Sequence, residues 1–168
     1  MVPPMTGVQS RISKPVEGLQ DRYSPNAVCF GCGPANPDGL HIKSRPEGDR
    51  LVADWLPGPQ HMAFAGFTSG GIIAMLLDCH GNMTAAYFLM KASGLEAPPG
   101  TVTAELTIRF QRPSPMKKTL HLSAWCTGIE GGRVSVEGSL EVDGVKTASM
   151  SGLYVAVKKG HPAFHKWE

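Results

Sequence analysis

One long helical pattern, over residues 70–91, constrains the fold of this chain more than any other feature. Apolar residues recur there at spacings of three and four, which is the period of an α-helix. Ser69 stands just ahead of the pattern as a good N-cap residue, and Gly94 follows it. The expected apolar stripe consists of Ile72, Met75, Leu76, Cys79 and Met83. Because the segment is apolar on several faces, we expect other parts of the chain to wrap around it.

After Gly100 the period of the sequence changes from that of a helix to that of a strand. Apolar residues alternate there with polar ones, so Thr103 and Arg109 are expected on the face opposite Leu106. The same alternation recurs along three further segments. The four expected strands are residues 101–111, about 120–126, 134–142 and about 146–157. Joined by turns, these strands predict a four-strand antiparallel meander.

Two shorter strands are expected before the helix, at residues 40–45 and 50–56. A sheet with one apolar face must bury that face, and the helix is the partner that the sequence offers. The predicted fold class is therefore α+β, with a curved antiparallel sheet wrapped around one long central helix. We divide the chain into an N-terminal arm over residues 1–28, one domain over 29–157 and a C-terminal tail over 158–168.

The charge and hydropathy of the chain argue against several classes of protein. A net charge of +2 is too small for the strong basic patch of a typical nucleic-acid-binding protein. No apolar run reaches the ~18 residues that a membrane helix needs, and the N-terminus lacks the apolar core of a signal peptide. We therefore expect a cytoplasmic protein without nucleic-acid or membrane partners.

Four cysteines raise the question of a metal site. They are Cys29, Cys32, Cys79 and Cys126. The first two form a lone Cys-x-x-Cys motif, whereas a structural zinc site takes about four ligands, so His41 or His61 would have to complete it. The last two lie within apolar patterned segments, where a free cysteine behaves as a small hydrophobic residue. We therefore expect no metal, and reduced thiols in a Gly-rich turn.

Three motifs, in order along residues 29–157, carry a resemblance to one family. In the central one, GFTSGGIIAMLLD, Gly70 and Gly71 open an apolar helix and Asp78 follows seven positions after the second glycine. It resembles the active-site signature of hotdog-fold acyl-CoA thioesterases, including the phenylacetate-degradation and 4-hydroxybenzoyl-CoA thioesterases. CFGCGPANPDGLHIK and TAELTIRFQRPSP are similar to the elements before and after it in that family. The family has His where this chain has Ser69.

The resemblance implies a hotdog fold and an enzyme that hydrolyses an acyl-CoA thioester without a cofactor. The N–H groups of Gly70 and Gly71 suit a carbonyl oxygen that gains negative charge, because a helix start carries unsatisfied donors and a positive dipole end. Asp78 then acts as nucleophile or as general base for water. The alternatives are close packing at the two glycines and a solvated helix carboxylate at Asp78.

The spacing of these groups also bears on the oligomeric state. Gly70 and Asp78 lie eight residues apart on one helix, or about 12 Å along its axis, so one carbonyl carbon cannot touch both. We therefore expect a homodimer, or a tetramer that contains it. Its two sites lie at the interface, and each combines Gly70 of one chain with Asp78 of the other.

Several further side chains are candidates for the site. Asn82, one helical turn after Asp78, shares its face and is expected to bind the attacking water. The substrate-binding candidates are His61, Met62, Phe64, Phe67, Ser69, Met83, Tyr87, Arg109 and Arg112. The apolar members would line a pocket for an aromatic or medium-chain acyl group, and the two arginines would meet the phosphates of coenzyme A. Ordinary core packing and a solvated strand edge are the alternatives for them.

Two other functions stay open at the level of the sequence. A hydratase or dehydratase of the same fold generally needs a His with an Asp, and His80 is only two positions from Asp78, on a different face of the helix. The other is a non-catalytic acyl-CoA-binding protein, because Ser69 replaces the family His.

Overall fold

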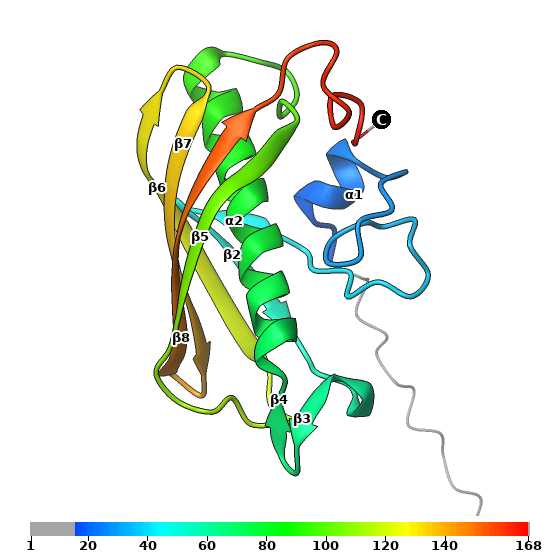
Figure 1. Ribbon diagram of the computed structural model, residues 1–168, viewed down its shortest axis with the longest axis vertical. Coiled ribbons are helices and arrows are strands. Elements are labelled where there is room, and N and C mark those ends of the chain that lie inside the picture. Colours follow the sequence, from blue (N-terminus) through cyan, green and yellow to red (C-terminus); the bar gives the residue numbers. More distant parts are fainter. Residues whose placement is uncertain (1–15, 168) are drawn as a thin grey trace, which may run out of the picture.

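A sheet of six antiparallel strands curves around the helix α2 in the computed structural model, which describes residues 16–167 (Figure 1). α2 spans Gly70–Ser93, and Gly94 ends it in the left-handed conformation with a φ of 63°. The strands of the sheet are β1 (Arg45–Glu47), β2 (Arg50–Trp55), β5 (Thr101–Phe110), β6 (Leu120–Glu130), β7 (Arg133–Val142) and β8 (Val145–Ala156). The predicted α+β architecture is confirmed.

The core lies between α2 and the face of the sheet that it covers. Leu76 on the helix and Leu122 on β6 are fully buried there. Tyr154 on β8 is also fully buried, and a Cβ at Gly81 would lie 2.2 Å from its hydroxyl, so only glycine lets this ring meet the helix. By length and composition α2 could also cross a membrane, but more than half of its apolar stretch is buried inside the protein, as in a core helix.

The predicted four-strand meander is wrong. The strands lie in the order β1-β2-β6-β7-β8-β5, so β6, β7 and β8 form a three-strand meander and β5 pairs with β8. The connection from β5 to β6 passes an unpredicted hairpin, β3 (Met62–Phe64) and β4 (Phe67–Thr68), where Pro115 bridges Phe67. Alternation along a strand shows which face it buries and leaves open which strand it joins. Because β5 is the last strand in this order, it forms one edge of the sheet.

A β-bulge in β5 also breaks the predicted alternation. The pairing register between β5 and β8 shifts between Thr103 and Glu105. A bulge adds one residue to one strand, so the side chains beyond it change faces. Thr103 points to α2, on the same side as Leu106, while Arg109 lies on the outer face of the sheet. The expectation that Thr103 and Arg109 share a face is wrong.

The described part of the expected N-terminal arm, residues 16–28, packs onto the domain. It contains the short helix α1 (Leu19–Tyr23), and Leu19 joins a buried apolar cluster with Met83 of α2. Residues 1–15 of that arm lie outside the described residues. A Pro- and Gly-rich sequence without periodicity gave no sign of this packing, because a single turn of helix is too short to show a period.

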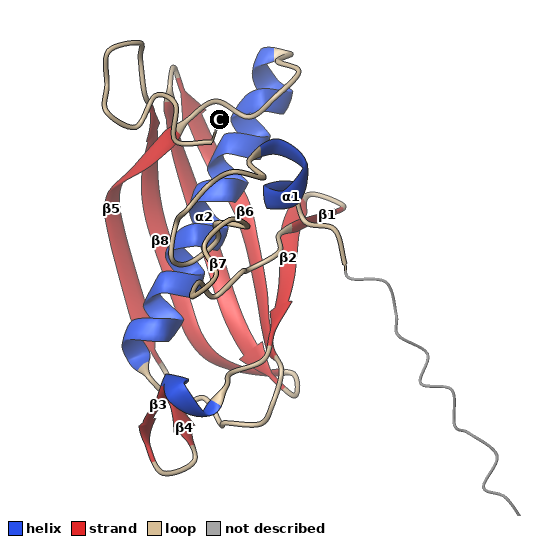
Figure 2. Ribbon diagram, turned by 90° about the vertical axis from the view of Figure 1, so that its right-hand side faces the viewer, coloured by secondary structure: helices blue, strands red, loops and turns tan. Residues whose placement is uncertain are grey.

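The predicted strand at residues 40–45 is also wrong, since β1 begins only at Arg45. Leu40 and Ile42 are buried without strand pairing, in a loop that crosses α2 on the side opposite the sheet (Figure 2). The apolar alternation that suggested a strand reflects contact with the helix. The strand predicted at residues 50–56 is confirmed as β2.

A buried chain of hydrogen bonds ties this N-terminal region to the helix. Gln20 Nε2 donates to Ser44 Oγ at 2.9 Å, and Ser44 Oγ donates to His80 Nδ1 at 2.9 Å. His80 Nε2 then donates to the carbonyl oxygen of Leu51 at 3.1 Å. Burial lowers the pKa of His80 to about 4, so the imidazole is neutral and each of its nitrogens has one partner.

Replacing His80 by Ala should destabilise the protein by about 3 kcal/mol, because it leaves a cavity and removes a partner from two buried polar groups. Chemical denaturation followed by circular dichroism measures this free energy of unfolding. The matched control is His121→Ala, which removes an exposed pair with Asp54 and should cost less than about 1 kcal/mol. Equal losses in the two variants would show that the buried chain does not stabilise the fold.

Candidate functional site

A pocket of ≈ 430 Å³ lies where the middle of α2 meets the start of β5, the N-terminal loop and the C-terminal tail. Its lining is mostly apolar or sulfur-containing, and Asp78 is the one carboxylate among the residues that line it. The lining residues are Ala27, Val28, Cys29, Cys32, Asp78, Cys79, Asn82, Met83, Val102, Thr103, Lys166 and Trp167. Of the predicted site residues, this pocket brings together Asp78, Asn82 and Met83.

The Asp78 carboxylate is half-buried at the wall of this pocket. Desolvation by burial raises its pKa, while the hydroxyl of Thr103 donates a hydrogen bond to Oδ1 at 2.7 Å and acts in the opposite direction. The bulge in β5 aims Thr103 at the helix, so the contact depends on that irregularity. The result is a carboxylate held in one orientation beside an open cavity.

Asn82 and the C-terminal tail close the end of the pocket next to β5. Asn82 Nδ2 donates to the carbonyl oxygen of Thr101 at 3.2 Å, and the Thr101 hydroxyl donates to Asn82 Oδ1 at 2.9 Å. Lys166 donates to the same carbonyl oxygen and to Asn82 Oδ1, and burial lowers its pKa. Both ends of the Asn82 amide therefore have partners, and the amide joins α2 to β5.

The start of α2 forms a second, separate part of the candidate site. Ser69 occupies the N-cap position, as predicted, but its side chain makes no capping hydrogen bond. Among the described residues, the N–H groups of Gly70, Gly71 and Ile72 have no hydrogen-bond acceptor. Three unpaired donors at the positive end of a helix can bind an oxygen atom that carries negative charge.

Packing within the chain does not explain the two glycines at this helix start. A Cβ at Gly71 would lie 3.7 Å from Ser69 Oγ, and a Cβ at Gly70 would lie 3.5 Å from the Phe110 ring. Both distances are ordinary van der Waals contacts, unlike the clash at Gly81. The alternative of close packing therefore finds no support among the described residues.

The predicted aromatic and sulfur side chains fall in two places. Met62, Phe64 and Phe67 lie on the β3–β4 hairpin beside the start of α2, where Phe64 is 60% exposed (Figure 1). Tyr87 lines a different pocket, next to α1. Within one chain these residues and Asp78 do not share a cavity.

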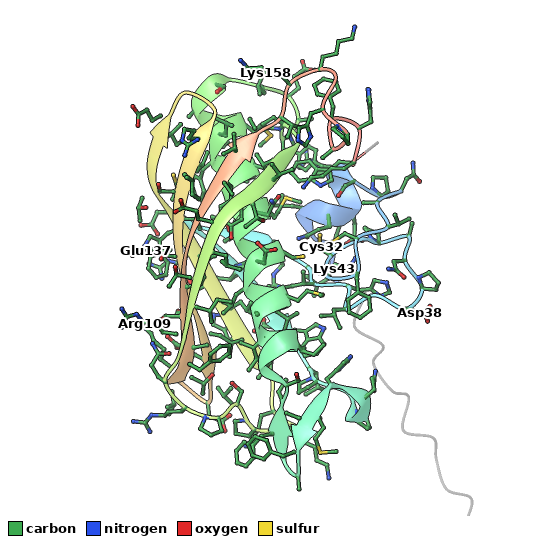
Figure 3. The ribbon with its side chains drawn as sticks, in the orientation of Figure 1. Cys32, Asp38, Lys43, Arg109, Glu137 and Lys158 are labelled. Atoms are coloured by element: carbon green, nitrogen blue, oxygen red, sulfur yellow. The ribbon has the colours of Figure 1, made fainter. Side chains whose placement is uncertain are left out.

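Among the basic candidates, Arg109 lies on the outer face of the sheet, in a groove with Glu137, and Figure 3 shows both on the side away from α2. Arg112 follows β5 and lines none of the pockets described above. The structure thus separates Arg109 from the pocket of its own chain.

His61 lies close to the helix start and lines a groove of ≈ 610 Å³ with Ile72. Its Nδ1 accepts a hydrogen bond from the Gly58 N–H at 2.9 Å, which leaves the proton of a neutral ring on Nε2. Burial lowers the pKa of His61, so the neutral form is favoured. His80 is held by Ser44 and Leu51, about 200° around the helix from Asp78, and does not form a pair with it.

The sequence did not indicate three features of the site. Thr103 was placed on the wrong face, and Lys166 lies in the C-terminal tail, where the sequence carries no motif. Cys79 was interpreted as a small hydrophobic residue, yet its sulfur lies 3.8 Å from that of Cys29. Only the Cys-x-x-Cys motif was a usable signal for any of these.

Comparison with known proteins places the chain in one superfamily. No protein-family model and no curated protein sequence matches it. Among solved structures it is similar to a thioesterase superfamily protein from Shewanella loihica, with 30% identity, 74% of this chain and 98% of that chain covered, and a TM-score of 0.61.

Two further structures share the fold at lower identity. The PaaI protein of the phenylacetic acid degradation operon of E. coli has 17% identity and a TM-score of 0.58, with 71% of this chain and 81% of that chain covered. A Streptococcus mutans protein, bound to acetyl-CoA, has 14% identity and a TM-score of 0.59, with 70% and 90% covered.

A curved antiparallel sheet around one long central helix defines a hotdog-fold protein. At 30% identity over almost the full length of the Shewanella protein, this chain belongs to the thioesterase superfamily.

Proposed function

We propose that this protein hydrolyses acyl-CoA thioesters to the free acid and coenzyme A. The observation that carries the proposal is the half-buried Asp78 in an apolar-lined pocket, oriented by Thr103. The unpaired N–H groups of Gly70 and Gly71 supply the second element that thioester hydrolysis needs. The acetyl-CoA bound to the Streptococcus mutans structure supports coenzyme A thioesters as the substrate class.

The proposed chemistry has two forms that use the same atoms. As a general base, an Asp78 oxygen takes a proton from water while the water oxygen bonds to the carbonyl carbon. The carbonyl oxygen gains the electron pair and accepts hydrogen bonds from Gly70 and Gly71, and the intermediate then expels the coenzyme A thiolate. As a nucleophile, the Asp78 carboxylate itself attacks the carbonyl carbon and displaces the coenzyme A thiolate. Water then hydrolyses the resulting anhydride, which releases the free acid and restores Asp78. Desolvation of Asp78 raises its pKa and strengthens it in the first role.

The edge strand β5 explains how two distant groups can form one site. Among the described residues β5 pairs only with β8, and Phe110 at its end is 55% exposed. Thr103, near its start, contacts Asp78, while Phe110 contacts the Gly70 end of the helix. A two-fold axis across this edge pairs β5 antiparallel with its copy, so the Phe110 end of each chain lies beside the Thr103 end of the other. We therefore propose a homodimer in which Asp78 of one chain faces Gly70 of the other.

The same dimer accounts for the hairpin residues. Met62, Phe64 and Phe67 lie at the Gly70 end, so in the dimer they approach the Asp78 pocket of the partner. Exposed apolar side chains in that position would complete the wall of an acyl pocket. We therefore propose an aromatic or medium-chain acyl group as the substrate class, to be compared in a panel of acyl-CoA esters.

Replacing Asp78 by Asn should lower kcat by about 100- to 10,000-fold, because Asn keeps the shape and the Thr103 contact but cannot take the proton or attack the thioester. Release of the coenzyme A thiol, measured with a chromogenic thiol reagent, reports the rate. Thermal unfolding serves as the control for a retained fold. Unchanged turnover in a folded Asp78→Asn protein would refute the assignment.

Replacing Gly70 by Pro should lower kcat by about 100- to 1,000-fold, the usual effect of one lost oxyanion donor. Proline at the first helical position removes this N–H group without breaking a hydrogen bond of the helix, and the ψ of 133° at Ser69 suits a residue before proline. Gly70→Ala is the matched control, since it adds a Cβ at a distance of 3.5 Å from Phe110 and keeps the N–H. An equal loss of kcat in Gly70→Ala and Gly70→Pro would indicate that steric crowding, and not the missing hydrogen-bond donor, lowers the rate.

Mixed dimers test the composite site directly. Chains carrying Asp78→Asn and chains carrying Gly70→Pro, co-expressed with different tags, should form heterodimers with one intact site and about half of the wild-type rate, since a two-fold dimer has two equivalent sites. Each parent homodimer should be almost inactive. Heterodimers as inactive as their parents, or a monomer in light scattering, would contradict the shared site.

A non-catalytic acyl-CoA-binding protein is the second candidate function. Ser69 stands where the resemblance calls for His, and its side chain does not cap the helix. Tight binding of acyl-CoA esters without release of the thiol would favour this candidate over hydrolysis. The hydratase alternative lacks a specific observation, because His80 is held away from Asp78.

A further inference from the structure

Three of the four thiols gather at one point of the molecule. The sulfur atoms of Cys29, Cys32 and Cys79 all lie within 4.8 Å of one another. Cys29 and Cys32 come from the N-terminal loop, and Cys79 comes from the middle of α2. Figure 3 shows Cys32 beside the helix, on the side away from the sheet. The fourth thiol, Cys126, lies elsewhere, on β6.

Two glycines bring the loop onto the helix and so create the cluster. A Cβ at Gly31 would lie 2.3 Å from the Cys79 sulfur, and a Cβ at Gly33 would lie 2.4 Å from the Cys29 nitrogen. The Gly33 N–H closes the turn by donating to the Cys29 carbonyl oxygen at 2.8 Å. The sequence Cys-Phe-Gly-Cys-Gly therefore needs glycine at both positions for the three sulfur atoms to meet.

We propose that Cys29, Cys32 and Cys79 bind a zinc ion through their thiolates. Zinc binds thiolates tetrahedrally at about 2.3 Å, which places two sulfur ligands about 3.8 Å apart. Cys29 and Cys79 are separated by 3.8 Å, so this pair already has the spacing of two zinc ligands. The remaining separations lie within 4.8 Å, and rotation of a side chain on the loop closes the difference.

The charges around the cluster suit this ion. Three thiolates and one Zn²⁺ carry a net charge of −1, and the ammonium group of Lys166 lines the same pocket.

Three protein ligands leave one tetrahedral position open. Cys29, Cys32 and Cys79 line the Asp78 pocket, so a water molecule from that pocket can occupy the fourth position. The ion would clamp the N-terminal loop to α2 and fix one wall of the pocket. The site does not depend on thioester hydrolysis, and its test is independent of any activity assay.

A disulfide is the competing use of these thiols. It would join two sulfur atoms at about 2.05 Å and leave the third without a role, whereas the structure places all three within 4.8 Å of one another. The two states are distinguishable because a disulfide lowers the mass of the intact chain by two hydrogens and binds no metal.

The test is metal analysis of the full-length protein, purified under reducing conditions without metal-affinity resin. Inductively coupled plasma mass spectrometry should find about one zinc per chain. Stripped, reduced protein should take up Co²⁺ and develop the intense absorption of a tetrahedral cobalt–thiolate site. A chelator should lower the melting temperature of the wild type, because zinc joins the loop to the helix.

Single variants assign the ligands. Cys29→Ser, Cys32→Ser and Cys79→Ser should each weaken zinc binding by more than about 100-fold, since even changes behind a ligand cost about 10- to 100-fold. Cys126→Ser is the matched control and should bind zinc as the wild type does. Circular dichroism confirms folding, and the two loop variants decide the matter if Cys79→Ser does not fold.

Three outcomes would overturn the proposal. The first is reduced wild-type protein that takes up neither zinc nor cobalt. The second is a folded Cys→Ser variant of the cluster that binds zinc as tightly as the Cys126→Ser control. The third is a freshly purified chain whose mass shows a disulfide within the cluster and which holds no zinc.

Discussion

Burial of α2 on two opposite sides is the constraint on which the rest of this structure depends. On one side, Gly81 lets the Tyr154 ring lie directly against the helix, inside the sheet. On the other side, the N-terminal loop presses Gly31 against Cys79, and His80 bonds to Ser44 within the same covering. A polar group on such a helix must find a partner inside the protein, or it must lie at the boundary between the sheet and the N-terminal loop. His80 does the first, and Asp78 does the second, which is why the pocket opens at that point.

The irregular parts of the fold supply the polar contacts of the candidate site. A regular β5 would turn Thr103 toward solvent, and the bulge turns it toward Asp78 instead. The C-terminal tail brings Lys166 over the same pocket, and the Gly-rich turn brings in two thiols. Asp78 and Cys79 are neighbours on the helix, so the proposed carboxylate chemistry and the proposed zinc ion would share one cavity. A metal there would hold the wall against which the acyl group packs.

The edge of the sheet connects the fold to the proposed assembly. β5 has an unpaired edge among the described residues, and an open edge normally invites pairing with another chain. The length of α2 separates its uncapped start from Asp78, and antiparallel pairing of two β5 strands would bring these ends together across the axis. In the proposed dimer, a second chain would cover the exposed Phe64 and Phe110 at that end.

The sequence by itself determined the elements whose signal is local. The helix at 70–91, the strand at 50–56 and the three strands from 120 to 157 follow from periodicity, which records the face that each element buries. The two glycines and Asp78 were visible because a helix start and a carboxylate within an apolar run are local features as well. Only the tertiary structure decided the place of β5 at the sheet edge, the contact of Thr103 with Asp78 and the meeting of Cys79 with Cys29 and Cys32. These depend on strand order, on a one-residue bulge and on a loop folding across the helix, and such contacts join residues that are 25 or more positions apart, where periodicity carries no information.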